Sequence, residues 1–362
     1  MIGSLLKKES LDKADICYLL KAKGDEQKAL FKHSAEVKRK TIGNKVYLRG
    51  LIELSNICAK NCYYCGIRKD NTNVDRYSLT DEEVLDAARF AHESRYGSVV
   101  MQSGELQGEG FGLRVERLLK KINELSSGKL GVTLSCGEQT EDVYKRWFEA
   151  GAHRYLLRIE SSSPELYARL HPNDSLHDFE KRLECLNLLR KIGYQVGTGV
   201  MIGLPFQTVE HLADDLLFMK KMDIDMCGMG PYIEHNQTPL IEHAGGLPPL
   251  EERLQLTLKM IAVLRMMMPT INMASTTALQ AIDKIGREKA IKIGANILMP
   301  NITPGLYRDS YALYENKPCT DESAEDCKNC IDIRVKMAGS VVAYGEWGDS
   351  LHFKEAKDRP KL

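Results

Sequence analysis

The strongest constraint on the fold of this chain is a regular alternation that begins at about residue 45. Short runs rich in Val, Ile, Leu, Tyr or Met alternate there with longer amphipathic stretches, which is the pattern of βα units repeated around a parallel sheet. Eight runs have the composition of strands, at residues 46–54, 98–103, 132–136, 155–160, 195–203, 224–230, 271–275 and 296–300. The sequence therefore predicts an α/β fold, a (β/α)8 barrel of the TIM type, with a doubly wound open sheet as the alternative.

The intervening stretches have helical spacing, and the one at 80–95 opens with a capping box formed by Thr80 and Glu83. We expect residues 1–42 to form an N-terminal helical extension, with one helix after Ser10 and another over 26–39. The barrel is expected to span 43–315 and to end with a short helix over 307–314. We expect residues 316–362 to form a C-terminal extension that begins with a polar, acidic loop at 317–329.

Composition excludes several classes of protein. The 50 basic and 50 acidic side chains balance, so no surplus of positive charge indicates a nucleic-acid partner. The N-terminus lacks the apolar core of a signal peptide, and no run of about 18 apolar residues could span a membrane. We therefore expect a cytoplasmic protein. Because thiols stay reduced there, the clustered members of its 10 cysteines indicate metal binding or catalysis rather than disulfides.

The first cysteine group has C-x3-C-x2-C spacing and follows the first expected strand directly, at Cys58, Cys62 and Cys65. In a barrel the loops after the strands form the active face. Three cysteines can hold three irons of a 4Fe-4S cluster and leave the fourth iron open to a ligand. The alternatives are reduced loop cysteines or a zinc site, although closed zinc sites use four ligands and no fourth Cys or His lies nearby.

Polar residues gather where other expected strands end. The second strand ends in a segment whose glycine admits a ligand close to the backbone and whose side chains can meet an ammonium group: Gln102, Ser103, Gly104 and Glu105. Arg158 and Glu160 alternate along the fourth strand and therefore face the same side. We expect that side to be the barrel interior, where two charges need each other or a ligand.

Further candidates follow the later strands. A glycine-rich run at 197–205 contains Met201, for which a place in the strand core is the alternative. After the seventh and eighth strands come polar and aromatic residues that are placed to close the top of the barrel, with helix capping and ordinary packing as the alternatives: Ser275, Thr276, Thr277, Tyr311 and Tyr314.

A second cysteine group lies beyond the barrel, at Cys319, Cys327 and Cys330. Its three thiolates predict another iron-sulfur cluster that lacks one protein ligand. The longer x7 spacing is less diagnostic, so bound zinc and free thiols remain alternatives.

The first cysteine group, with Tyr64 just before its last cysteine, resembles the signature of the radical S-adenosylmethionine (SAM) superfamily. The resemblance implies a full or partial (β/α)8 barrel in which SAM chelates the open iron. An electron from the cluster then cleaves SAM to methionine and a 5′-deoxyadenosyl radical. By the same resemblance Cys58, Cys62 and Cys65 are cluster ligands, and Tyr64 lies near the adenine.

Within the superfamily the sequence resembles the HydE family of FeFe-hydrogenase maturases, which is related to biotin synthase and methylornithine synthase. Segments over nearly the whole chain carry this resemblance, at 58–71, 76–80, 100–105, 154–172, 182–208 and 298–319. It implies SAM contacts by the 102–105 segment at the amino group, Glu160 at the ribose, Arg182 at the carboxylate and Met201 beside the adenosyl group. It also implies substrate contacts, by Arg158, Ser275, Thr276, Thr277 and Tyr311.

The resemblance further implies assembly of the diiron subcluster of FeFe-hydrogenase from a cysteine-bound iron carbonyl cyanide synthon, an anionic organometallic small molecule. Other hydrogenase maturases and a flavodoxin- or ferredoxin-type electron donor are the implied partners. Since only some family members carry the second cysteine group, a cluster there is implied to be accessory. Three alternatives remain: a methylornithine-synthase-like mutase, a biotin-synthase-like sulfur-inserting enzyme and a non-enzymatic iron-sulfur scaffold.

Overall fold

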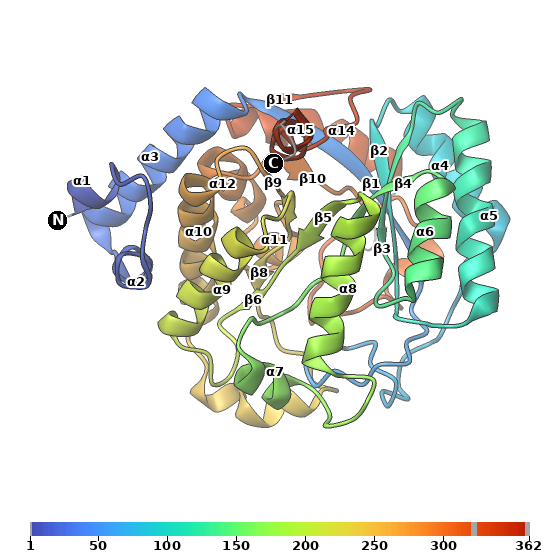
Figure 1. Cartoon of the computed structure of the whole chain (residues 1–362), viewed down its shortest axis with the longest axis horizontal. Coiled ribbons are helices and arrows are strands. Elements are labelled where there is room, and N and C mark those ends of the chain that lie inside the picture. Colours follow the sequence, from blue (N-terminus) through green and yellow to red (C-terminus); the bar gives the residue numbers. More distant parts are fainter. Residues whose placement is uncertain (1, 320–323, 359–362) are drawn as a thin grey trace.

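A parallel sheet surrounded by helices forms the centre of the computed structural model, which describes residues 2–319 and 324–358 (Figure 1). Neighbouring strands follow the order β10-β1-β2-β3-β4-β5-β7-β9, and β11 (Val341–Val342) pairs with the start of β1. The strands of this path are β1 (Lys45–Ser55), β2 (Ser98–Ser103), β3 (Gly131–Ser135), β4 (Ala152–Leu156), β5 (Gln195–Thr198), β7 (Met226–Cys227), β9 (Asn272–Met273) and β10 (Ile297–Leu298). The predicted parallel βα architecture is confirmed.

The first and last strands of the path, β10 and β9, lie side by side. The Asn296 amide donates to the Met273 carbonyl at 2.9 Å, and the Ser275 amide donates to the Ile297 carbonyl at 2.9 Å. A parallel bridge also pairs Ala274 with Ile297. The carboxyl ends of all eight strands are thereby brought around one central space.

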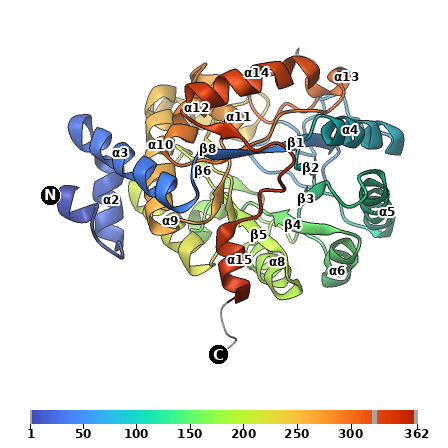
Figure 2. The same ribbon diagram turned by 90° about the horizontal axis from the view of Figure 1, so that it is seen from above.

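Helices cover the outside of the sheet in chain order (Figure 2). They are α4 (Asp81–Glu93), α5 (Glu109–Leu125), α6 (Glu141–Glu149), α8 (Phe179–Ile192), α9 (Val209–Lys221), α10 (Leu250–Met267) and α12 (Gly286–Ile293). The predicted capping box begins α4: the Glu83 amide donates to Thr80 Oγ1 at 3.2 Å and the Thr80 amide donates to Glu83 Oε2 at 2.7 Å. None of the described helices is both long enough and apolar enough to cross a membrane.

The N-terminal extension contains α1 (Ile2–Leu5), α2 (Lys13–Lys21) and α3 (Gly24–Thr41). Both expected helices are present, as α2 and α3. They contact α9, α10 and α12 on one flank of the barrel-like body. Ser34 Oγ donates to the Ile293 carbonyl at 3.0 Å, which fixes α3 to the segment that leads into β10.

Five of the expected strands are shorter than the composition predicted. The runs at 271–275 and 296–300 contain the two-residue strands β9 and β10. The run at 195–203 divides into β5 and β6 (Met201–Ile202), and the run at 224–230 divides into β7 and β8 (Gly230–Pro231), with β6 and β8 pairing separately. The breaks face each other, and a Cβ atom on Gly199 would lie only 1.8 Å from the Gly228 carbonyl oxygen. The strand expected at 155–160 is β4, which begins earlier, at Ala152, and ends at Leu156.

Two predictions about the C-terminal part are wrong. The expected helix over 307–314 is the four-residue α13 (Gly305–Arg308), and Tyr311 and Tyr314 lie in the loop that follows. The expected loop over 317–329 already contains the start of α14 (Ala324–Met337). Apolar residues beyond that window bury one face of α14, among them Val335 at 0% exposure, and the helix extends back from them.

The last described segment closes the end of the sheet where the strands begin. The Gly348 carbonyl accepts hydrogen bonds from Arg49 on β1 at 3.2 Å and from Asn272 on β9 at 2.8 Å. Asp349 Oδ1 accepts from Arg154 on β4 and from Gln195 on β5, both at 2.8 Å. Helix α15 (Leu351–Asp358) then ends the described chain. The sequence patterns gave no indication of this closure.

Candidate active site

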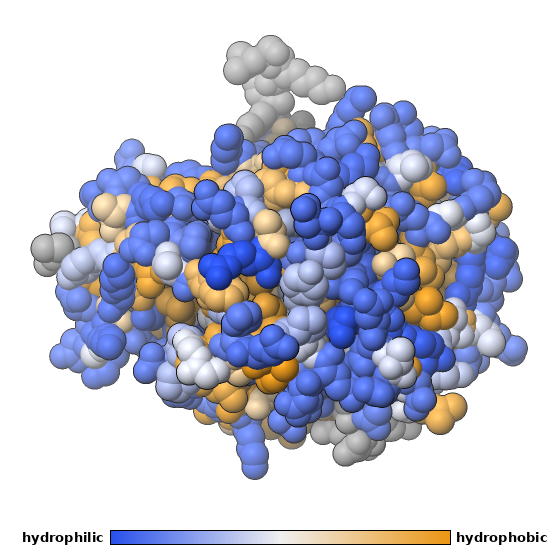
Figure 3. Space-filling model, turned by 90° about the horizontal axis from the view of Figure 1, so that it is seen from below, coloured by the Kyte–Doolittle hydropathy of each residue, from blue (hydrophilic) through white to orange (hydrophobic). Residues whose placement is uncertain are grey.

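One cavity of about 370 Å³ opens among the carboxyl ends of the strands. Hydrophilic side chains cover much of the face on this side of the molecule, with apolar residues between them (Figure 3). The cavity is lined by every described candidate site residue: Cys58, Cys62, Tyr64, Cys65, Gln102, Ser103, Gly104, Glu105, Arg158, Glu160, Arg182, Met201, Ser275, Thr276, Thr277, Tyr311, Tyr314, Cys319 and Cys330. The Cys327 side chain lies outside the described residues.

Three backbone contacts hold the loop with the first cysteine group. The Ala59 amide donates to the Glu105 carbonyl at 2.8 Å, which attaches the loop to the end of β2. The Tyr63 amide donates to the Leu170 carbonyl of α7 (Pro164–Leu170) at 3.0 Å. The Asn61 amide donates to His177 Nε2 at 2.9 Å. The segments after β2 and β4 therefore position the cysteines.

The three cysteines of the first group are partly buried in the cavity wall. Burial raises the pKa of Cys62 to about 12 and raises the pKa of Cys65 well above its ordinary value. Burial also raises the pKa of Cys58, partly offset by backbone N–H groups, of which the Glu105 amide lies 3.3 Å from Sγ. Thiolates at such positions need bound positive charge in place of the proton, which either a metal ion or an iron-sulfur cluster provides.

Among the side chains that the structure describes, no group of three or more His, Cys, Asp or Glu residues converges as the ligands of a single metal ion.

Four charged side chains form a buried network beside the cysteine loop. Arg182 Nε lies 2.7 Å from Glu138 Oε1, and Arg182 Nη2 lies 3.3 Å from Glu105 Oε2. Lys60 Nζ lies 3.1 Å from Glu105 Oε1 and 3.0 Å from Glu138 Oε2. The two cations balance the two anions, and the side chains are at most 10% exposed. Lys60 and Glu138 were missed because a lone charge in a loop gives no periodic signal.

Arg158 and Glu160 lie in the segment that follows β4, and their side chains pair with each other. Arg158 donates from Nε to Glu160 Oε1 at 2.7 Å and from Nη2 to Oε2 at 2.8 Å, in a bidentate pair. Glu160 has a φ of 64°, in the left-handed region that is strained for a residue with a side chain. Its amide donates to the Gly199 carbonyl at 3.0 Å, which helps to hold this conformation. The predicted common orientation is therefore present, although not on a regular strand.

Tyr64 is fixed by a buried histidine. Its hydroxyl lies 3.2 Å from His171 Nε2, and His171 Nδ1 lies 2.8 Å from the Tyr167 carbonyl. Burial lowers the pKa of His171 to about 3, so the ring is neutral at pH 7. With Nδ1 protonated and donating to the Tyr167 carbonyl, Nε2 accepts a hydrogen bond from the Tyr64 hydroxyl, and this holds the tyrosine against the cysteine loop.

The candidates after the later strands line the other side of the cavity. Thr277 Oγ1 lies 2.9 Å from the Tyr314 hydroxyl, and Gln102 Nε2 donates to the Tyr311 hydroxyl at 3.2 Å. Ser275 Oγ donates instead to the Arg287 carbonyl at 2.9 Å, so its hydroxyl already serves the local fold. Glu53, Asn301 and Lys317 also line this side and were missed by the sequence analysis.

The second cysteine group contributes to the same cavity. Gln280 Nε2 donates to Cys319 Sγ at 3.8 Å. Cys330 is exposed and belongs to α14, which also carries the backbone of Cys327. The described residues thus bring Cys319 and Cys330 to the cavity wall.

Comparisons with known proteins identify the family to which the chain belongs. Residues 52–219 match the family model of the radical SAM superfamily, whose members are enzymes that use a 4Fe-4S cluster and SAM. Over 322 residues the chain is 43% identical to the [FeFe] hydrogenase maturase subunit HydE of Thermotoga maritima, covering 88% of each chain. The chain therefore belongs to the radical SAM superfamily and, within it, to the family of the HydE maturase subunit.

More distant relatives share the architecture. The 3-methylornithine synthase of Methanosarcina acetivorans is 25% identical over 88% of this chain and 86% of its own. The crystal structure of methylornithine synthase (PylB) superposes with a TM-score of 0.78 at 23% identity, over 95% of this chain and 98% of that one. The FeFe-hydrogenase maturase HydG from Carboxydothermus hydrogenoformans gives 0.78 at 19% identity, over 95% and 79%. These structures support the fold.

Proposed function

We propose that this chain is a radical SAM maturase that acts in assembly of the diiron subcluster of FeFe-hydrogenase. Its substrate is a cysteine-bound iron carbonyl cyanide synthon. One observation carries the proposal: residues far apart in the sequence, from Cys58 to Tyr311, line a single cavity in a chain that is 43% identical to a HydE maturase subunit.

In this proposal Cys58, Cys62 and Cys65 hold a 4Fe-4S cluster with one open iron. The cluster and SAM together supply the 5′-deoxyadenosyl radical. Tyr64 and Met201 flank the adenosyl group, Glu160 binds the ribose, and the 102–105 segment receives the SAM amino group. Arg182 receives the SAM carboxylate through its guanidinium, for which it must exchange part of its pairing with Glu105.

The remaining cavity wall binds the substrate. Arg158 attracts the anionic synthon, while Ser275, Thr276, Thr277 and Tyr311 line its binding space. We propose that the sheet acts as a closed barrel that excludes water and competing hydrogen donors, supported by the contacts between β9 and β10. Cys319, Cys327 and Cys330 hold an accessory iron-sulfur cluster.

The proposal assigns the chain a catalytic barrel at 43–315, with an N-terminal extension at 1–42 and a C-terminal extension at 316–362. Its partners are other hydrogenase maturases and a flavodoxin- or ferredoxin-type donor that reduces the cluster. The balanced charge of the chain and the lack of a membrane-spanning helix among the described ones fit a cytoplasmic site of action.

The proposal is tested by replacing the HydE component with this chain in maturation of a purified apo-hydrogenase. We expect hydrogen evolution from the matured hydrogenase and none when this chain is left out. A chain that cleaves SAM but supports no maturation would contradict the assigned substrate and leave the radical SAM assignment intact.

A further inference from the structure

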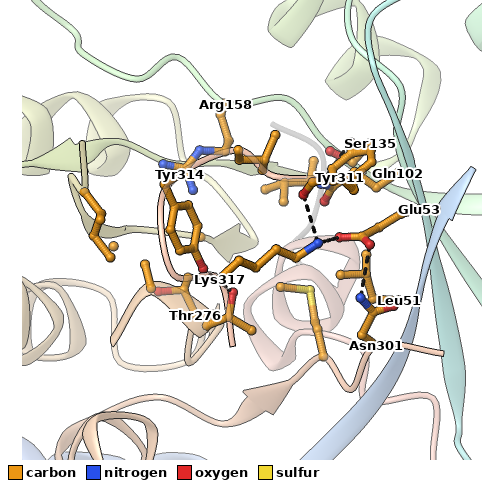
Figure 4. Close-up of a pocket in the computed structure, with 18 of the residues that line it drawn as sticks. Leu51, Glu53, Gln102, Ser135, Arg158, Thr276, Asn301, Tyr311, Tyr314 and Lys317 are labelled. Atoms are coloured by element: carbon orange, nitrogen blue, oxygen red, sulfur yellow. Dashed lines mark hydrogen bonds and ion pairs between the residues drawn. The ribbon is translucent and has the colours of Figure 1, made fainter. Parts of the chain in front are cut away.

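A buried ion pair stands in the wall of the cavity and has no part in the proposed handling of SAM. Lys317 Nζ lies 2.5 Å from Glu53 Oε1 and donates to the Tyr311 carbonyl at 3.0 Å (Figure 4). Asn301 Nδ2 donates to the other carboxylate oxygen, Glu53 Oε2, at 3.0 Å. The acceptors from β1 and from the loop after α13 thus form a cage around one primary ammonium group.

The carboxylate in this cage is built into the fold. Glu53 lies on β1 between apolar neighbours and is 1% exposed. Burial raises the pKa of Glu53, and the charge of Lys317 opposes that shift. A carboxylate at such a position requires a cation beside it to stay ionised. The cage therefore selects for positively charged groups that can donate hydrogen bonds.

The cation comes from the chain itself, close to the second cysteine group. The Lys317 side chain is 9% exposed and projects into the cavity from two residues before Cys319. Arg158 lies across the cavity from Glu53 in Figure 4. The hydrogen bonds of Arg158 to Glu160 and to the Val200 carbonyl use Nε and Nη2, and its Nη1 has no partner among the described residues. A carboxylate receptor and an ammonium receptor thus face one space.

We propose that Glu53, Asn301 and the Tyr311 carbonyl form the ammonium-binding subsite of the substrate, and that Lys317 fills this subsite until an amino-acid group displaces it. Arg158 binds the carboxylate of that amino-acid group. The inference rests on the proposed function, in which the substrate contains cysteine, and it specifies that the cysteine enters with its ammonium and carboxylate both free. Exchange of one primary ammonium for another keeps Glu53 paired, so the buried charge stays compensated throughout.

The test compares two probes of similar shape, S-methyl-L-cysteine and 3-(methylthio)propionate, which lacks the ammonium group. Neither has a free thiol that could bind iron. Calorimetric titration uses the full chain, reconstituted without oxygen and saturated with SAM. For the wild type we expect affinity for S-methyl-L-cysteine to be about tenfold or more higher than for the analogue, as a charge-assisted hydrogen bond provides.

Variants of the cage residues test whether Glu53 and Lys317 determine the preference for S-methyl-L-cysteine. Glu53→Gln should abolish most of it, because the amide keeps the shape and loses the charge. Lys317→Met should bind S-methyl-L-cysteine about tenfold or more tightly than the wild type does, because the internal competitor is gone. The double variant Glu53→Gln/Lys317→Met buries no charge at the cage, so it keeps the test open if Glu53→Gln alone fails to fold, and it should show no preference.

The control is Lys145→Met, which removes an exposed lysine paired with Glu141 at 2.9 Å on the outer helix α6 and should match the wild type. The proposal is overturned if Lys317→Met binds S-methyl-L-cysteine no more tightly than the wild type, or binds none. It is also overturned if the preference survives loss of the Glu53 charge. Release of 5′-deoxyadenosine by the wild type is measured separately, so that failure of the subsite and failure of the proposed function give different results.

Discussion

Removal of Arg182 is expected to destabilise the protein through charge imbalance. Arg182 and Lys60 neutralise Glu105 and Glu138 at distances between 2.7 and 3.3 Å, and all four side chains are nearly inaccessible to water. Arg182→Met leaves two buried carboxylates with one ammonium group. Loss of one partner from a buried charge pair costs about 3–5 kcal/mol. We therefore expect the free energy of unfolding of the metal-free protein to fall by about that amount.

A second substitution separates charge imbalance from loss of packing. Arg182→Met/Glu138→Gln restores neutrality, with Lys60 still paired to Glu105, and should recover about half or more of the loss. Arg117→Met is the control, because Arg117 is 52% exposed in its ion pair with Asp81 and should cost less than about 1 kcal/mol. Urea unfolding at pH 7 measures all of these variants. A double variant no more stable than Arg182→Met would refute the reasoning.

Three further perturbations follow from the same structure. Arg158→Ala should lower hydrogenase maturation about tenfold or more, because a charged donor to the anionic substrate is lost; an unchanged maturation yield would contradict that role. Cys319→Ser should lower the iron content of reconstituted protein while the signal of the first cluster persists in electron paramagnetic resonance, and unchanged iron would argue for free thiols. Burial raises the pKa of Asp349, but hydrogen bonding from His153 and the charge of Arg154 outweigh it and hold that pKa below its ordinary value. The stability that this carboxylate provides is present above its unfolded pKa of about 3.9 and is lost as the pH falls toward its native value. Below about pH 4 the free energy of unfolding of the wild type should therefore fall more steeply than that of Asp349→Asn, by up to about 1.4 kcal/mol per pH unit, as measured by urea unfolding. Equal pH slopes for wild type and variant would contradict this.

The fold was predictable to the extent that local composition determines it. Runs of β-branched and aliphatic residues located all eight strands of the path, and the Thr80 capping box marked the start of α4 correctly. The strand ends were not predictable, because Gly199 and Gly228 break their strands by approaching each other across 29 positions of sequence. Such a contact leaves no trace in either run alone. The start of α14 was missed for a related reason, since residues further along the chain bury its apolar face.

The candidate site was predictable where a motif combined several residues. The cysteine spacing and the polar strand ends identified residues that line the cavity, and the family resemblance added Arg182 and Met201. The missed residues, Lys60, Glu138 and Lys317, are single charges whose partners come from distant segments. Glu53 did give a signal, as a lone carboxylate in the apolar run that forms β1. A charge in such a strand needs a buried partner or a ligand, so it deserved a place among the candidates.

Release of 5′-deoxyadenosine from SAM tests the central claim most directly. The measurement uses protein reconstituted without oxygen and reduced with dithionite, beside Cys62→Ala prepared in the same way. The account predicts release by the wild type and none by the variant, because Cys62 is needed to hold the cluster. No release from wild-type protein that carries its cluster would contradict the account and favour a non-enzymatic iron-sulfur scaffold.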